Sequence, residues 1–138
     1  MSGITLPLRT AILRHIFHGD EMPTPPLALY VAAFTAAGEV SAADTGYARV
    51  RVAAREGWTE PDELGAVANT DWIDFAPATG SYSGQVVRYE LYDAAAGGTS
   101  WASATLPEPV AIIRNDQLRI KPGALTFTLR ERSEEAAS

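Results

Sequence analysis

The amino-acid sequence predicts a mainly β protein: a single antiparallel β-sandwich or jelly-roll-like domain with one N-terminal helix. Apolar residues with helical spacing occur close to the N-terminus. From Leu27 onward, short apolar or alternating runs are separated by turn sequences such as ATGSYSG, AAAGG and KPG, which is typical of a sandwich. The chain of 138 residues, 46% of them hydrophobic, is long enough for one domain with a substantial core.

The predicted helix has Thr5 as its N-cap and Pro7 in its first turn, and Gly19 is expected to end it. Three residues at four-residue spacing are expected to form its apolar face: Leu8, Ile12 and Ile16. The segment DEMPTPPLA follows, and its three prolines predict an extended linker. We therefore expect three regions: the helix and the start of the linker at residues 1–22, the β-sandwich at residues 23–130, and a flexible charged tail at residues 131–138.

Four predicted strands carry the clearest patterns: Leu27–Phe34, Tyr47–Ala54, Trp72–Ala76 and Gln85–Tyr92. The first is rich in alanine, which suits a helix, but its aromatic and β-branched residues and the prolines before it favour a strand. Shorter runs complete the series: SWASATL, PVAII, DQLRI and LTFTLR.

Alternation within these runs predicts which side chains face the core. Ile73 and Phe75 are expected to share one face of their strand. In Gln85–Tyr92, one face is expected to carry Val87, Tyr89 and Leu91. In the last strand, the face expected to be buried carries Leu125, Phe127 and Leu129.

The segment Thr45–Val52, TGYARVRV, combines a strand pattern with two arginines. Alternation directs Val50 and Val52 toward the core. Arg49 and Arg51 then lie on the opposite, polar face, where a guanidinium group can form two parallel hydrogen bonds with a carboxylate. We expect these arginines to bind carboxylates of a neighbouring subunit. The alternative is a pair of solvated arginines balanced by local acids.

The overall composition excludes several classes of function. A net charge of −6, a pI near 4.8 and a single lysine, Lys121, argue against nucleic-acid binding, which requires clustered Lys and Arg. The sequence has no cysteine, so disulfides and thiolate metal sites are excluded. No apolar run approaches the roughly 20 residues of a membrane span, and no signal-peptide pattern is present, so we expect a soluble protein without a membrane partner.

Candidate catalytic and metal-binding residues are few. His15 and His18 are three residues apart, as two metal ligands can be, but there is no third histidine. The alternative is a structural role, because the helix dipole favours cationic side chains at the carbonyl end of a helix. The serines lack a nucleophile-elbow motif. Acids such as Asp71 and Asp74 leave a carbohydrate-active enzyme as a distant alternative. We therefore expect no catalytic residue, no cofactor, no metal site and no enzymatic activity.

Aromatic residues are the remaining candidates for binding, because Tyr and Trp are favoured at interfaces, although many in a sandwich belong to the core. Tyr82 lies in a turn rich in Gly and Ser, and Trp58 lies in the loop between Glu56 and Asp71. The predicted protein-interface residues are Arg49, Arg51, Tyr47, Trp58 and Tyr82.

Several motifs occur together in a characteristic order: LRTAILRHIFHG, TPPLALYVAAFT, GYARVRV, a Trp with an I-x-F-x-x-A-T-G turn, VVRYELYDAAAGG and DQLRIKPGALTFTL. In this order they resemble a family of small tailed-bacteriophage virion proteins, often labelled phage tail fibre proteins. Similar chains occur as capsid decoration, or cement, proteins. The resemblance extends from about Leu6 to Leu129, although LYVAAFT departs from the usual LYVALHT and the loop from Glu56 to Asp71 has no clear family pattern.

The resemblance implies a structural virion protein of a tailed bacteriophage, made in the bacterial host cytoplasm. Because the sequence shows no shaft, repeat or heptad pattern, we expect a capsid decoration protein that binds the outside of the major capsid protein lattice and stabilises the shell. The alternative is a tail-fibre or receptor-binding module. The expected partners are the major capsid protein and the chain itself, as a homodimer or homotrimer on the outer capsid surface.

Overall fold

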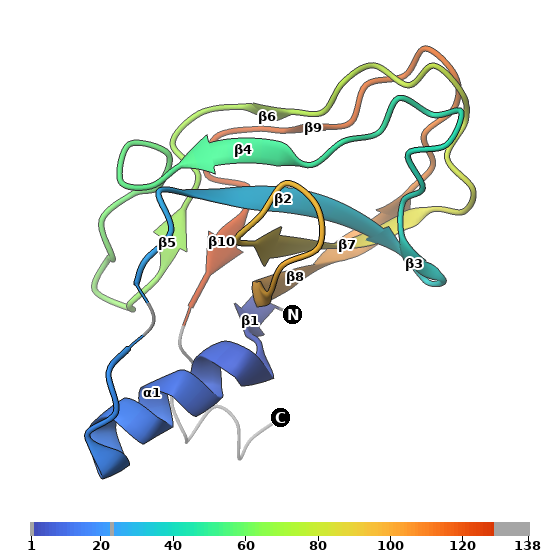
Figure 1. Ribbon diagram of the computed structural model, residues 1–138. Coiled ribbons are helices and arrows are strands. Elements are labelled where there is room, and N and C mark those ends of the chain that lie inside the picture. The colour runs from blue at the N-terminus through green and yellow to red at the C-terminus, as the bar shows by residue number, and fades with distance from the viewer. Residues whose placement is uncertain (1, 23, 129–138) are drawn as a thin grey trace.

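The structure, a computed structural model, describes residues 2–22 and 24–128. Two layers of antiparallel strands enclose a core, and the helix lies beside one end of the sheets (Figure 1). The elements in this part of the chain are β1 (Ser2–Ile4), α1 (Leu6–His18), β2 (Ala28–Thr35), β3 (Gly38–Glu39), β4 (Val50–Ala53), β5 (Val67–Ala68), β6 (Ile73–Asp74), β7 (Val86–Tyr92), β8 (Ser100–Val110), β9 (Arg119–Ile120) and β10 (Thr126–Phe127).

Strand β2 is the centre of the larger sheet. It pairs with β7 along one edge and with β3 and β4 along the other, while β7 pairs with β8, and β8 with β1. All of these pairings are antiparallel. The residues from Val31 to Thr35 are buried on both faces of the strand. This burial explains why the β2 sequence is continuously apolar rather than alternating.

The smaller layer consists of two ladders, β6 with β9 and β5 with β10. Phe75 directly follows β6, has no exposed surface and occupies the centre of the core. Its ring stacks on Tyr47 and Tyr89, with centroid distances of 6.0 Å and 6.3 Å. Because Tyr89 belongs to β7, this stack of three rings joins the two layers.

The structure confirms the mainly β fold class, with a sandwich-like arrangement and one helix. The strands predicted at Leu27–Phe34 and Gln85–Tyr92 correspond to β2 and β7. Ile73 and Phe75 are both buried, as alternation predicts. Four other predicted strands occur in shorter form as β4, β6, β9 and β10. Leu125 and Phe127 are buried as expected, and Leu129 lies outside the described residues.

The region around β8 requires a correction. The sequence predicts two strands, over SWASATL and PVAII, but the structure has one continuous strand. Pro107 and Pro109 lie where the pairing of β7 with β8 changes register, and a bulge of this kind tolerates residues that lack an N–H group. Next to this irregularity Val86 is buried and Val87 is half-buried, so the predicted shared face holds for Tyr89 and Leu91, which are both buried, and fails at Val87.

The sequence did not predict a strand before the helix. β1 pairs with β8, and the Thr5 N–H donates to the Trp101 carbonyl oxygen at 2.9 Å. The Thr5 hydroxyl donates to the Ser100 carbonyl oxygen and makes no capping hydrogen bond to the helix. Thr5 therefore attaches the start of α1 to β8. Gly19 ends the helix in a left-handed conformation, with a φ of 70°, as predicted.

The central position of Phe75 leads to a stability prediction. Phe75→Ala removes a ring packed from both layers and should lower the free energy of unfolding by about 3–5 kcal/mol, through lost burial and a residual cavity. Phe17→Ala is the matched control, because the Phe17 ring is 74% exposed and its loss should change stability by no more than about 0.5 kcal/mol. Urea unfolding of both variants measures the difference, and similar losses would contradict the assigned core.

Candidate protein-binding site

The structure places the five predicted interface residues in unequal environments. Tyr47 and Tyr82 are buried, Trp58 is half-buried, and the side chain of Arg49 is only 6% exposed. Arg51 is the only one of the five whose residue is exposed. The five residues therefore do not form one binding surface.

Arg49 lies at the centre of a hydrogen-bond network. Its guanidinium group binds Glu39 through two bonds, from Nε to Oε2 at 2.8 Å and from Nη2 to Oε1 at 2.9 Å. Nη1 donates to the carbonyl oxygens of Ala94 and Gly97, both at 2.8 Å. The guanidinium group also lies over the Tyr92 ring, 3.9 Å from its centroid. Arg49 therefore connects β3, the segment before β4, and the loop between β7 and β8.

Tyr47 extends this network into the core. Its hydroxyl donates to Glu39 Oε2 at 2.7 Å and accepts from the Ala33 N–H at 3.0 Å. Burial raises the pKa of Tyr47 above its ordinary value, and the hydrogen bond to Glu39 raises it further. The hydrogen bond from Arg49 holds the pKa of Glu39 below its ordinary value of 4.5, despite the opposing effect of burial.

The network corrects the prediction for Arg49. The expected carboxylate is present, but it belongs to Glu39 of the same chain, ten residues earlier. Alternation correctly places Arg49 on the face opposite Val50. It does not predict that a turn brings Glu39 next to Arg49. Tyr47 likewise serves the interior of the domain.

Trp58 and Tyr82 also pack inward. The Trp58 ring lies edge-on to Phe127, with centroids 6.1 Å apart, and the Tyr82 ring lies edge-on to Tyr47 at 6.1 Å. Burial raises the pKa of Tyr82. Contacts of this type stabilise a core, and they leave little ring surface for a partner.

Arg51 lies beside a shallow groove between β4 and the segment that precedes β6. The groove has a volume of about 220 Å³, and its lining includes Arg51, Glu56, Asp71 and the half-exposed ring of Trp72. Arg119 stacks on that ring, with its guanidinium carbon 4.3 Å from the centroid. The groove therefore has charges of both signs beside one aromatic ring.

Helix α1 provides a different surface. None of its residues is buried, although Leu8, Ala11 and Ile12 are partly covered. The predicted apolar face of Leu8, Ile12 and Ile16 is thus only partly correct, because Ile16 is exposed. Within the described residues, no helix has the length and apolarity needed to cross a membrane.

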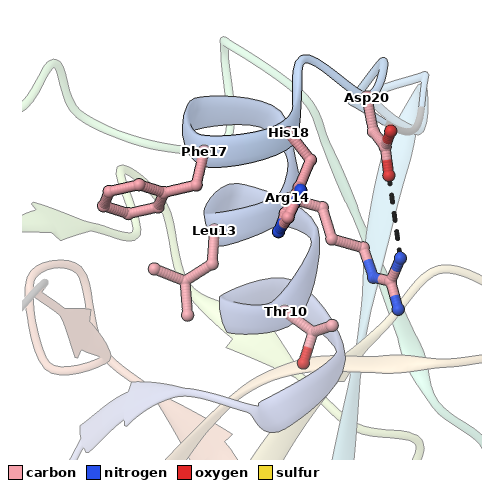
Figure 2. Close-up of a pocket in the computed structure, with 6 residues that line it drawn as sticks. All are labelled: Thr10, Leu13, Arg14, Phe17, His18 and Asp20. Atoms are coloured by element: carbon pink, nitrogen blue, oxygen red, sulfur yellow. Dashed lines mark ion pairs between the residues drawn. The ribbon is translucent and has the colours of Figure 1, made fainter.

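The outward side of α1 borders an open hollow of about 570 Å³ (Figure 2). Leu13 and Phe17 project from one side of the helix, and Arg14 reaches toward Asp20 on the other, at 3.7 Å (Figure 2). His15 Nδ1 lies 2.8 Å from the Asp20 carbonyl oxygen. No group of three His, Asp or Glu residues in the described ranges is arranged to hold a metal ion. The surface offers apolar contact and positive charge, the properties of a protein-docking face.

The buried guanidinium of Arg49 leads to a second prediction. Arg49→Lys keeps the positive charge but cannot reproduce the bidentate bond together with both carbonyl contacts, so we expect a loss of about 1–3 kcal/mol in the free energy of unfolding. Arg119→Lys is the control, because its 2.7 Å ion pair with Asp74 is exposed, and it should cost at most about 0.5 kcal/mol. Equal losses in urea unfolding would refute the special role of Arg49.

The lowered pKa of Glu39 predicts an acid-sensitive contribution to stability. Because the unfolded chain binds this proton more readily than the folded chain, the contribution is complete above the ordinary pKa of 4.5 and is lost as the pH falls through the folded pKa. Glu39→Gln removes this contribution, so its unfolding free energy should fall less steeply from about pH 5 to about pH 3 than that of the wild type. Parallel pH profiles would contradict this assignment.

Comparison with known proteins assigns the chain to a family. The model of the family described as podophage GP4 fiber I protein gp80 matches residues 3–128, a range that includes α1 and all strands from β2 to β10. A search of curated proteins gives no match. The family match confirms the resemblance to tailed-phage virion proteins. The chain belongs to the podophage GP4 fiber I protein gp80 family, a family of tailed-phage virion structural proteins.

Proposed function

We propose that the chain is a subunit of a podophage fibre, which acts through protein–protein contact and catalyses no reaction. The observation that carries this proposal is the outward side of α1, where Leu13 and Phe17 are exposed beside Arg14. The helix contains no Asp or Glu. An apolar and positively charged face on a compact domain is suited to docking on another protein. The family description, which names a fiber protein, supports the fibre in particular.

Capsid decoration is the second candidate. The motif resemblance includes decoration proteins, and a compact domain with one docking face suits binding in many copies to the major capsid protein lattice. On such a lattice, many modest contacts together give stable attachment. In that role the chain lies on the outer capsid surface. Neither role requires a nucleic acid, a membrane or a cofactor.

The position of the chain in the virion distinguishes these roles. Purified particles are separated into heads and tails, and the chain is quantified in each fraction by mass spectrometry. The fibre role predicts the chain in the tail fraction, whereas decoration predicts it in the head fraction at a copy number comparable with that of the major capsid protein. Absence of the chain from both fractions would overturn a structural role in the virion.

The docking role of α1 is tested by complementation. Phage lacking the gene is grown in cells that supply either Leu13→Asp/Phe17→Asp or the control Ile113→Asp, which changes an exposed apolar residue outside the helix. We expect the α1 variant to be incorporated at least about tenfold less than the wild type, because it places charges in an apolar contact. The control should be incorporated normally. Equal incorporation of both variants would exclude α1 as the attachment surface.

A further inference from the structure

Three of the four large apolar residues that are exposed on α1 lie in one stripe, and Ile16 lies outside it. Leu6, Thr10, Leu13 and Phe17 follow one another at spacings of four, three and four residues, which places them on one face of the helix. We call these four residues the outer stripe. Its three apolar members, Leu6, Leu13 and Phe17, are exposed by 65%, 55% and 74%. A stripe of this exposure and spacing is a contact surface that residues 2–22 and 24–128 leave uncovered.

The outer stripe is bordered by positive charge. Arg9 and Arg14 are exposed on the helix, which has no carboxylate of its own. The contact of Arg14 with Asp20 is exposed and 3.7 Å long, so it contributes little in water. The remainder of the chain has nine arginines and lysines against 17 acidic residues. The helix is therefore a basic element on an acidic protein.

A complementary surface lies elsewhere on the same chain, in residues 55–66, which we call the acidic loop. It carries one arginine and four carboxylates, all on exposed residues: Arg55, Glu56, Glu60, Asp62 and Glu63. Leu64 lies at its tip and is 82% exposed. Asp62 Oδ1 accepts hydrogen bonds from the N–H groups of Leu64 and Ala66, at 2.8 Å and 2.9 Å, so the tip is held in one shape. A preformed loop loses little conformational entropy on binding.

We propose that the outer stripe of one copy of the chain docks on the acidic loop of a second copy. Leu64 then packs against Leu13 and Phe17, while Arg9 and Arg14 face the carboxylates of the loop. This inference rests on the proposed function, in which α1 is the docking surface, and it names the partner of that surface. Within one chain, the exposure of Leu13, Phe17 and Leu64 shows that they do not cover one another.

Charge disfavours the simplest alternative arrangement, in which two α1 helices pack together. Each helix carries Arg9 and Arg14 without any carboxylate, so such a pair brings like charges into contact. Docking of α1 on the acidic loop pairs opposite charges instead. Two copies related by a two-fold axis satisfy both helices and both loops in one closed assembly.

The first test is sedimentation velocity of the purified full chain over a concentration series at low and high salt. We expect a self-associated species that weakens as salt rises, because the border of the contact is ionic. A monomer at every concentration would overturn the proposal. The same outcome combined with loss of Leu13→Asp/Phe17→Asp from particles would show that α1 docks on another virion protein, which leaves the proposed function intact.

A charge exchange tests the contact itself. Arg9→Glu/Arg14→Glu and Glu60→Lys/Glu63→Lys alter exposed residues only, so both variants should keep the wild-type circular dichroism spectrum. Alone, each places like charges in the contact, and its dissociation constant should rise at least about tenfold. An equimolar mixture of the two should regain wild-type affinity, because every contact then pairs opposite charges. The acidic helix of one variant meets the basic loop of the other, and at the second contact an unaltered helix meets an unaltered loop.

Two controls make this result specific. Ile113→Asp changes an exposed apolar residue outside both surfaces and should associate like the wild type. A chain that ends at residue 128 tests the segment 129–138 as an alternative occupant of the outer stripe. If this truncation alone produced self-association through α1, that segment would be the occupant and the proposal would be wrong. Failure of the mixed variants to regain affinity would overturn it equally.

Discussion

The bidentate contact of Arg49 with Glu39 is the interaction on which the rest of the domain depends. β3 has only two residues and β4 has four, and strands of this length are marginal alone. Arg49 connects them to each other and, through Ala94 and Gly97, to the loop between β7 and β8. A buried N–H group without an acceptor is costly. Moving any one of these segments away would leave an N–H group of Arg49 without its acceptor, so the contact fixes their relative positions.

The residues held by this contact belong to the interior of the domain and are separate from α1, the proposed binding surface. Arg49 and Tyr47 have the sequence pattern expected of a charged interface, but both side chains bind Glu39 of the same chain and stabilise the domain. The apolar surface of α1 has the opposite character, because Leu13 and Phe17 contribute little to the core and stay exposed. The β-domain is thus a rigid support, and its attachment through Thr5 and β1 fixes the orientation of the helix. A rigidly oriented contact surface suits a structural protein of the virion.

The sequence predicted those features that depend on local pattern. Alternation at Val50 and Val52 identified a strand, the aromatic and β-branched residues of Leu27–Phe34 identified β2, and Gly19 marked the end of the helix. Contacts between distant segments were not predictable in this way. The partner of Arg49 depends on a turn after β2, and β1 depends on an edge of β8 that no pattern near the N-terminus reveals. The helix has apolar residues on two faces, and only tertiary packing determines which face stays open.

The central claim is that a rigid β-domain presents α1 for contact with another copy of the chain. Hydrogen–deuterium exchange of the free protein at increasing concentration tests it most directly, because it reports protection along the whole backbone. We predict that amides of α1 and of residues 55–66 gain protection together, while those of β2 and β7 stay equally slow at every concentration. Protection that appeared only outside these two segments, or that never changed with concentration, would contradict the claim.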